Sequence, residues 1–143
     1  MAFEAKITRA RFVLGPFTSE QMQSIGQVAA DAIKARILSG VNVQDQPSKA
    51  LKPNYEKLKT KRGRAPIRDW YFRGLTLGSL KVKTADENRV VVGFVSPQAD
   101  RIAHINNLRE KAFGVSPNDS KAVNAAVLAT LKQFKVIRFQ KVA

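Results

Sequence analysis

The sequence predicts an α+β fold, in which a long amphipathic helix packs on a small, mostly antiparallel β-sheet. Residues 18–39 place apolar side chains every three or four positions, as a helix with one buried face does. Residues 80–95 contain two runs of β-forming residues separated by a polar turn, as in a hairpin. A second, C-terminal helix and an extended basic arm complete the fold. The length of 143 residues predicts a single domain, residues 1–143.

Residues 3–14 show a partial alternation of apolar and polar side chains. Phe3, Ala5 and Ile7 share one parity, and Ala10, Phe12 and Leu14 share the other. The phase changes near Thr8, so the pattern predicts one strand with a bulge or two short strands. Gly15 and Pro16 then end the strand region.

Residues 18–39 carry the clearest helix signals. Thr18 followed by Gln21 is a capping-box pattern, and Gly40 follows the last turn as a C-cap. The apolar positions form one stripe, which predicts that the helix covers one side of a sheet. The stripe contains Met22, Ile25, Ala29, Ile33 and Ile37.

The hairpin is predicted from residues 80–84, a turn at residues 85–88 and a second strand at residues 89–95. Asp and Asn in the turn are ordinary hairpin-loop residues. The run of Val90, Val91 and Val92 predicts that the second strand is deeply buried. We therefore expect the hairpin to form the centre of the sheet.

Two further helices are predicted after the hairpin. Residues 97–109 have helical spacing, with Ser96 as the cap and Pro97 at the first position. The second helix is predicted at residues 116–133. The negative charge of Asp119 near its start interacts favourably with the positive end of the helix dipole.

Residues 134–143 form an apolar and basic C-terminal tail. They fit a last helical turn, an edge strand, or a tail that becomes ordered on a neighbouring subunit. Apolar side chains on such a tail make candidate subunit contacts, here Phe134, Ile137 and Phe139.

Residues 41–68, which we name the basic arm, look non-regular apart from one short predicted helix at residues 54–61. Residues 49–73 contain nine basic and two acidic residues, and thus hold half of the net charge of +14. Such a segment indicates nucleic acid, a phosphate-rich surface or an acidic protein as partner, although a solvated basic loop is the simpler alternative. The candidate contact residues are Lys49, Lys52, Lys57, Lys59, Lys61, Arg62, Arg64 and Arg68.

Aromatic residues accompany these cations. Tyr55 lies within the basic arm, and Trp70 and Tyr71 follow it. Aromatic and basic side chains together are typical of single-strand binders, but no nucleic-acid recognition motif is present, so the pattern supports at most sequence-independent contact with phosphates. All three aromatic residues are also candidate subunit contacts.

The residue inventory argues against an enzyme. The chain has no Cys and one His, His104, and its eleven carboxylates are scattered. Phosphate-binding glycine loops and hydrolase motifs are absent, so we expect no catalytic residues, no metal and no cofactor. No apolar run approaches the length of a membrane span, and residues 1–12 lack the apolar region of a secretory signal, so no membrane association is expected.

The order of short motifs resembles the virion-morphogenesis and tail-completion proteins of tailed bacteriophages, which are neck proteins at the head–tail junction. Residues 75–80, LTLGSL, are similar to the family's L-T-G-x-L-x-x-S-L element, and residues 113–116, FGVS, are similar to its F-L-G-x-S ending. The resemblance covers about residues 19–120. It also includes Ala35-Arg36-Ile37, residues 51–59 (LKPNYEKLK), Val92-Gly93-Phe94 and residues 102–106 (IAHIN).

The resemblance implies an α+β structural protein of the virion, a neck, tail-completion or tail-terminator subunit. Such a subunit would form a ring of six or twelve copies around the DNA channel, between portal- or adaptor-side proteins and tail-side proteins, after assembly in the host cytoplasm. Non-specific contact with DNA in the channel would be possible. The alternative from the residues alone is a sequence-independent nucleic-acid-binding module associated with the ribosome or the nucleoid.

Overall fold

The computed structural model describes residues 17–69 and 75–142, with the backbone alone for Leu75 and residues 133–142. The strand or strands predicted for residues 3–14 lie outside this part of the chain. The elements follow one another as α2 (Ser19–Leu38), α3 (Pro53–Lys61), α4 (Leu75–Gly78), β1 (Leu80–Ala85), β2 (Val90–Phe94), α5 (Pro97–Asn107) and α6 (Pro117–Val142).

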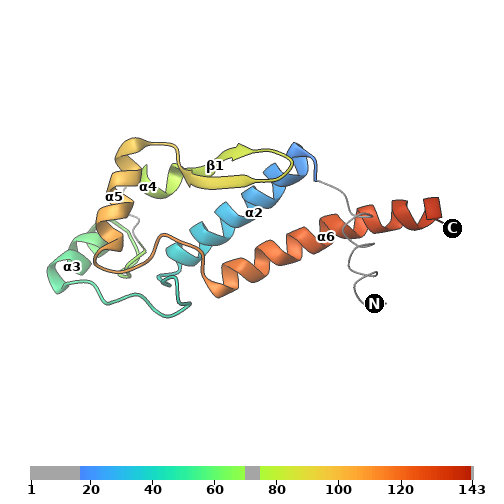
Figure 1. The fold of residues 1–143 in the computed structure, drawn as a ribbon. Coiled ribbons are helices and arrows are strands. Elements are labelled where there is room, and N and C mark those ends of the chain that lie inside the picture. The colour runs from blue at the N-terminus through green and yellow to red at the C-terminus, as the bar shows by residue number, and fades with distance from the viewer. Residues whose placement is uncertain (1–16, 70–74, 143) are drawn as a thin grey trace.

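Helix α2 is the centre of the fold. It packs against both strands of the hairpin and against α6, while α3 and α5 lie together at one end of the molecule (Figure 1). The described residues thus form the predicted α+β fold, with the long helix on an antiparallel two-stranded sheet and a C-terminal helix in contact with it. Among the described residues, no helix has both the length and the apolar character needed to cross a membrane.

The start of α2 confirms the predicted capping box, whereas the C-cap is Ser39 and not Gly40 as predicted. The Thr18 hydroxyl accepts a hydrogen bond from the backbone N–H of Gln21 at 3.1 Å, and the Gln21 side chain accepts one from the N–H of Thr18 at 2.9 Å. Ser39 is the C-cap, and Gly40 follows it with φ of 72°, a conformation that favours glycine. Local chemistry therefore sets both ends of the helix.

The hairpin also forms as predicted. Leu80 pairs with Phe94 and Ala85 with Val90, and the register shifts once between Val82 and Thr84, as in a β-bulge. The carboxylate of Asp86 accepts hydrogen bonds from the N–H groups of residues 88 and 89, both at 2.8 Å, which closes the turn.

Strand β2 corrects one expectation. All five of its residues are half-buried, whereas the valine run predicts deep burial. The physical reason is that β2 pairs only with β1 among the described residues.

The main core lies between the second half of α2 and the base of the hairpin. Ile33, Ile37, Leu77 and Leu80 are buried together, and the half-buried Val92, Phe94 and Phe113 pack against them. The rings of Phe94 and Phe113 meet edge to face, with centroids 5.6 Å apart. Contacts between buried apolar side chains therefore hold α2, the hairpin and the segment after α5 together.

The later helices start as predicted. The Ser96 hydroxyl accepts from the N–H of Ala99 at 3.3 Å, with Pro97 at the first position of α5. The Ser116 hydroxyl accepts from the N–H of Asp119 at 3.1 Å, and the Asp119 carboxylate accepts from the N–H of Ser116 at 3.0 Å. Helix α6 then continues through Val142, so residues 134–142 extend this helix and do not form an edge strand.

A buried ion pair connects four separate parts of the chain. Arg36, in the last turn of α2, donates its Nε–H to Asp119 at 2.9 Å, and both side chains are about 95% buried. The rest of the guanidinium donates to the carbonyl oxygens of Val41 at 2.9 Å, Ala112 at 3.0 Å and Gly114 at 2.7 Å. We name these five residues the Arg36 network. It fixes α6, the loop after α2 and the loop after α5 to the end of α2.

The substitution Arg36→Met should destabilise the protein by about 3–5 kcal/mol, because it leaves the carboxylate of Asp119 buried without its cation. Urea unfolding followed by circular dichroism measures the change. Arg89→Met, which removes an exposed arginine in the hairpin turn, is the control and should change stability by less than about 0.5 kcal/mol. Equal effects of the two variants would contradict a structural role for the network.

The substitution Gly26→Ala should destabilise the protein by about 1–3 kcal/mol. A Cβ at Gly26 would lie 2.5 Å from the Val90 side chain and 2.9 Å from that of Val82, so α2 and the hairpin would have to separate. Gly78→Ala is the matched control, since a Cβ there meets nothing within 4 Å. Thermal unfolding should show the control to be neutral or stabilising. An unchanged stability in Gly26→Ala would mean that the hairpin can shift freely on the helix.

Candidate functional site

The basic arm begins with a segment that is fixed to the body of the protein. Residues 41–47 form a tight turn in which the Asn42 side chain accepts hydrogen bonds from the N–H groups of residues 44 and 46. The N–H of Val43 donates to the carbonyl of Lys111 at 3.1 Å, and the Asp45 carboxylate accepts from the N–H of Asn118 at 2.9 Å. Residues 41–48 therefore do not project. The projecting part of the arm is residues 49–68, which contain α3.

Helix α3 confirms the short helix predicted within the arm. Lys52 is its N-cap and Pro53 its first residue, which needs no amide hydrogen bond. Lys59 and Lys61 lie in the last turn, where a positive charge interacts favourably with the negative end of the helix dipole. Gly63 follows the helix with φ of 69°.

A second buried ion pair fixes α3 to the segment that leaves the arm. The ammonium of Lys59 donates to the carboxylate of Asp69 and, at 2.8 Å, to the carbonyl of Ile67. The Lys59 side chain is only 2% exposed. This corrects the prediction that Lys59 is a surface contact, because its charge is used inside the protein.

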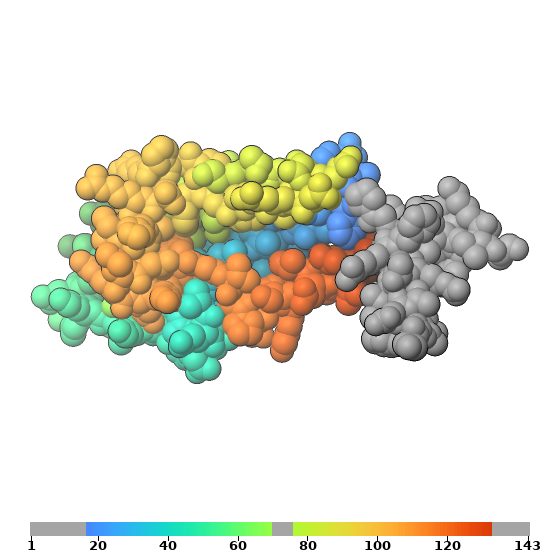
Figure 2. All heavy atoms as spheres, viewed as in Figure 1, coloured from blue at the N-terminus to red at the C-terminus, as the bar shows by residue number. Residues whose placement is uncertain are grey.

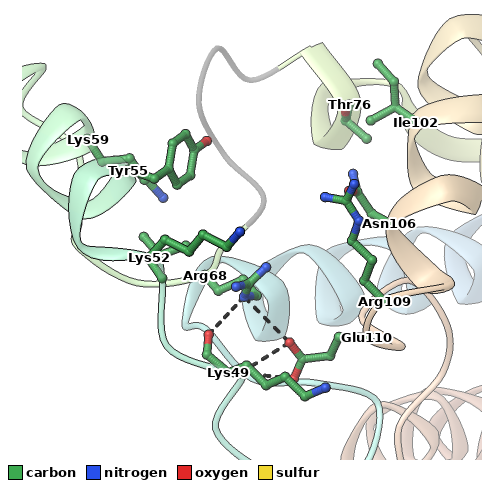
Figure 3. Close-up of a pocket in the computed structure, with 11 residues that line it drawn as sticks. Lys49, Lys52, Tyr55, Lys59, Arg68, Thr76, Ile102, Asn106, Arg109 and Glu110 are labelled. Carbon is green, nitrogen blue, oxygen red and sulfur yellow. Dashed lines mark hydrogen bonds and ion pairs between the residues drawn. The ribbon is translucent and has the colours of Figure 1, made fainter.

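The two ends of the projecting part are joined at its base. Arg68 donates to the carbonyl oxygens of Lys49 at 2.9 Å and Ala50 at 3.1 Å, and its guanidinium lies 3.7 Å from the carboxylate of Glu110. Glu110 in turn accepts from the N–H of Lys49. Figure 3 shows this closed set of contacts. The arm is therefore a closed loop held on the segment after α5.

A pocket of about 700 Å³ lies between the arm and α5 (Figure 3). Five basic side chains and one acidic side chain line it, so it carries an excess of positive charge. Lys59 and Arg68 already bind acceptors within the protein. The electrostatic potential of the pocket is therefore set mainly by the other three cations, which are Lys49, Lys52 and Arg109. We name it the basic pocket; its lining is Lys49, Leu51, Lys52, Tyr55, Lys59, Arg68, Thr76, Ile102, Asn106, Arg109 and Glu110.

The structure brings together some of the predicted contact residues and separates others. The basic pocket is lined by Lys49, Lys52, Arg68 and Tyr55, and Tyr55 is 42% exposed. The remaining predicted contact residues of the arm do not line the pocket and are exposed; they are Lys57, Lys61, Arg62 and Arg64.

Other predicted residues are not placed. Trp70 and Tyr71 lie outside the described residues. Phe134, Ile137 and Phe139 belong to α6 by their backbone, and their side chains also lie outside the description. Their role as subunit contacts stays a prediction.

The sequence does not indicate two residues of this site. Arg109 adds a cation to the pocket from the segment after α5, and Glu110 anchors the arm. Both act on residues about 40 to 60 positions away in the chain, so no local spacing connects them to the arm. The charged run Arg109-Glu110-Lys111 at a helix end was the only signal that could have suggested them.

The basic pocket can hold an anionic group by charge and can bury an apolar or aromatic group against Tyr55, Leu51 and Ile102. Its only carboxylate, Glu110, is engaged with Arg68 and the N–H of Lys49. No group of three potential metal ligands occurs within residues 17–69 and 75–142. No family model, curated protein or solved structure matches the chain.

The substitution Lys59→Met should destabilise the arm, because it leaves the carboxylate of Asp69 buried without its ammonium partner. Loss of one partner of a buried pair costs about 3–5 kcal/mol. Lys61→Met makes the same chemical change at an exposed position of the same helix. Limited trypsin digestion should cleave the Lys59→Met variant within residues 57–64 faster than either the parent or Lys61→Met. Equal cleavage rates would show that the ion pair does not hold the arm.

Proposed function

We propose that the protein is a structural subunit of a tailed-phage virion, at the junction between head and tail. In this role it assembles as a ring of six or twelve copies around the DNA channel, between portal- or adaptor-side proteins and tail-side proteins. The motif resemblance over residues 19–120 suggests this class. The α+β fold, with a long helix on an antiparallel sheet, is the architecture that the resemblance implies.

The observation that most supports a structural subunit is the closed construction of the basic arm. Two sets of contacts, Lys59 with Asp69 and Arg68 with Glu110, hold the arm in one shape before any partner binds. A preformed projection loses little conformational entropy on binding, which favours repeated contacts in an assembly. Ring closure needs contacts between unlike surfaces of identical chains, and a projecting arm supplies one such surface.

Apolar residues at the surface are consistent with further contacts between subunits. Leu108 is 76% exposed, Val115 59% and Leu128 58%. Scattered exposed apolar residues are common, but these occur on a chain that also carries a projecting arm.

A sequence-independent nucleic-acid-binding module is the second candidate. The excess of cations around the basic pocket favours it, together with the exposed ring of Tyr55. The two candidates differ in their dependence on salt and assembly. A nucleic-acid binder loses affinity steeply as salt rises, and the logarithm of its binding constant falls by about 0.9 per phosphate contact for each unit of log salt.

The double substitution Lys57→Glu/Lys61→Glu should weaken assembly by at least about tenfold. The two charge reversals place negative charges on α3, and an acidic partner surface that binds the lysines would repel them. Mass photometry and electron microscopy of the full chain, alone and mixed with junction proteins encoded beside it, measure ring formation. Lys81→Glu/Lys83→Glu reverses two exposed lysines of β1 and should assemble normally.

Salt-titrated DNA binding completes the test. A chain that stays monomeric with all neighbours, and binds DNA tightly in a strongly salt-dependent way, would refute the neck proposal and favour the second candidate.

A further inference from the structure

The outer surface of α5 carries exposed apolar side chains beside the basic pocket. Ile102, Ile105 and Leu108 follow one another every three residues, and their exposed fractions are 38%, 43% and 76%. Leu108, the C-cap, keeps helical backbone angles, so successive members of this set are neighbours on the helix surface. Ile102 also lines the basic pocket. We name these three residues the α5 stripe. Figure 2 shows α5 at the surface, at the end of the molecule where α3 projects.

Cations border the α5 stripe on the side of the basic pocket. Arg109 follows Leu108 directly, and Figure 3 shows Lys52 and Arg109 on opposite sides of the pocket. Both side chains are exposed, as is that of Lys49. An apolar groove of about 550 Å³ between the hairpin and α6 differs in this respect, since its described lining residues include Asp100 and no cation. Positive charge and an exposed aliphatic surface therefore meet beside α5.

This combination distinguishes between two classes of partner. A single-stranded nucleic acid places its phosphates on cations and its bases on aromatic rings, so it would leave an aliphatic stripe unused. An amphipathic protein helix places apolar residues, spaced three or four apart, on such a stripe. Acidic residues beside them would meet the cations. The aliphatic stripe with cations along one side therefore favours an acidic amphipathic helix over a nucleic acid.

We propose that the α5 stripe and the basic pocket together bind an acidic amphipathic helix of a partner protein. The stripe extends about 9 Å along α5, which corresponds to about two turns of the bound helix. Apolar side chains of that helix pack on the stripe and on Leu51 in the pocket, and its carboxylates pair with Lys52 and Arg109. The identification of the partner as a junction protein rests on the proposed function, whereas the binding surface itself does not.

Fluorescence anisotropy of the full chain with labelled peptides tests the proposal. The probe is a helical peptide of about 16 residues, with leucine every three or four positions and glutamate on both sides of the leucine face. It should bind at least about tenfold more tightly than a scrambled peptide of the same composition, because scrambling keeps the charge and removes the apolar face. Equal affinity for the two peptides would overturn the proposal, since charge attraction alone would then explain the binding.

A pair of matched variants tests the apolar part of the surface. Ile105→Ser/Leu108→Ser should weaken probe binding by about tenfold, because two apolar contacts are lost. Leu38→Ser/Leu128→Ser makes the same kind of change at exposed residues of α2 and α6 and should bind the probe as the parent does. Circular dichroism checks that all variants keep the parental helix content. An affinity that the α5 variant leaves unchanged, or that both variants lower equally, would contradict the proposal.

Charge reversal tests the basic part. Lys52→Glu/Arg109→Glu should weaken probe binding by about tenfold or more, because both substituted positions would repel the glutamates of the probe. Lys81→Glu/Lys83→Glu changes the net charge by the same amount on β1 and should have a much smaller effect. Equal losses in the two variants would show that only the net charge of the protein matters, which would overturn the assignment to the basic pocket.

A thymidine oligonucleotide, titrated in the same assay, distinguishes the two classes of partner. Tighter binding of the oligonucleotide than of the probe, unchanged in Ile105→Ser/Leu108→Ser, would overturn the proposal in favour of a nucleic acid. The two proposals also fail separately. Ring formation without preferential binding of the probe would refute the helix-binding surface alone. Preferential binding of the probe by a chain that never assembles with its neighbours would refute the proposed function alone.

Discussion

The ion pair between Arg36 and Asp119 is the constraint on which the rest of the structure depends. Two residues 83 positions apart meet at 2.9 Å, and the remaining guanidinium donors bind three carbonyl oxygens. A buried charge is tolerated only when its hydrogen bonds are satisfied, so the end of α2 accepts one arrangement of the loops around it. Because Asp119 also caps α6, the same contact directs α6 back along α2.

A similar device builds the basic arm. Lys59 of α3 binds Asp69 in the segment that leaves the arm, and Arg68 and Glu110 join the two ends of residues 49–68. The charge available to a partner is therefore less than the sequence total. What remains is a helix of fixed orientation with exposed lysines, which can present charge at a defined position. Such an arm favours specific contact in an assembly, whereas a solvated loop would mainly improve solubility.

Local features of the fold were predictable, and long-range ionic contacts were not. The capping box at Thr18, the Ser96-Pro97 start of α5 and the hairpin turn at Asp86 depend on residues within four positions of one another. Whether Arg36, Lys59 or Arg68 is a surface cation or a buried partner depends on residues brought close only by the fold. Periodicity cannot distinguish a buried lysine from an exposed one on a short basic helix such as α3.

The burial of β2 follows the same logic. The composition Val-Val-Val-Gly-Phe predicts a strand covered on both faces and paired on both edges, because charged residues normally mark an exposed edge. The described residues cover β2 only in part, and the uncovered part borders an apolar groove. The basic pocket lies beside α3 and α5 and the groove lies between the hairpin and α6, so one body carries a charged surface and an apolar surface that can act separately.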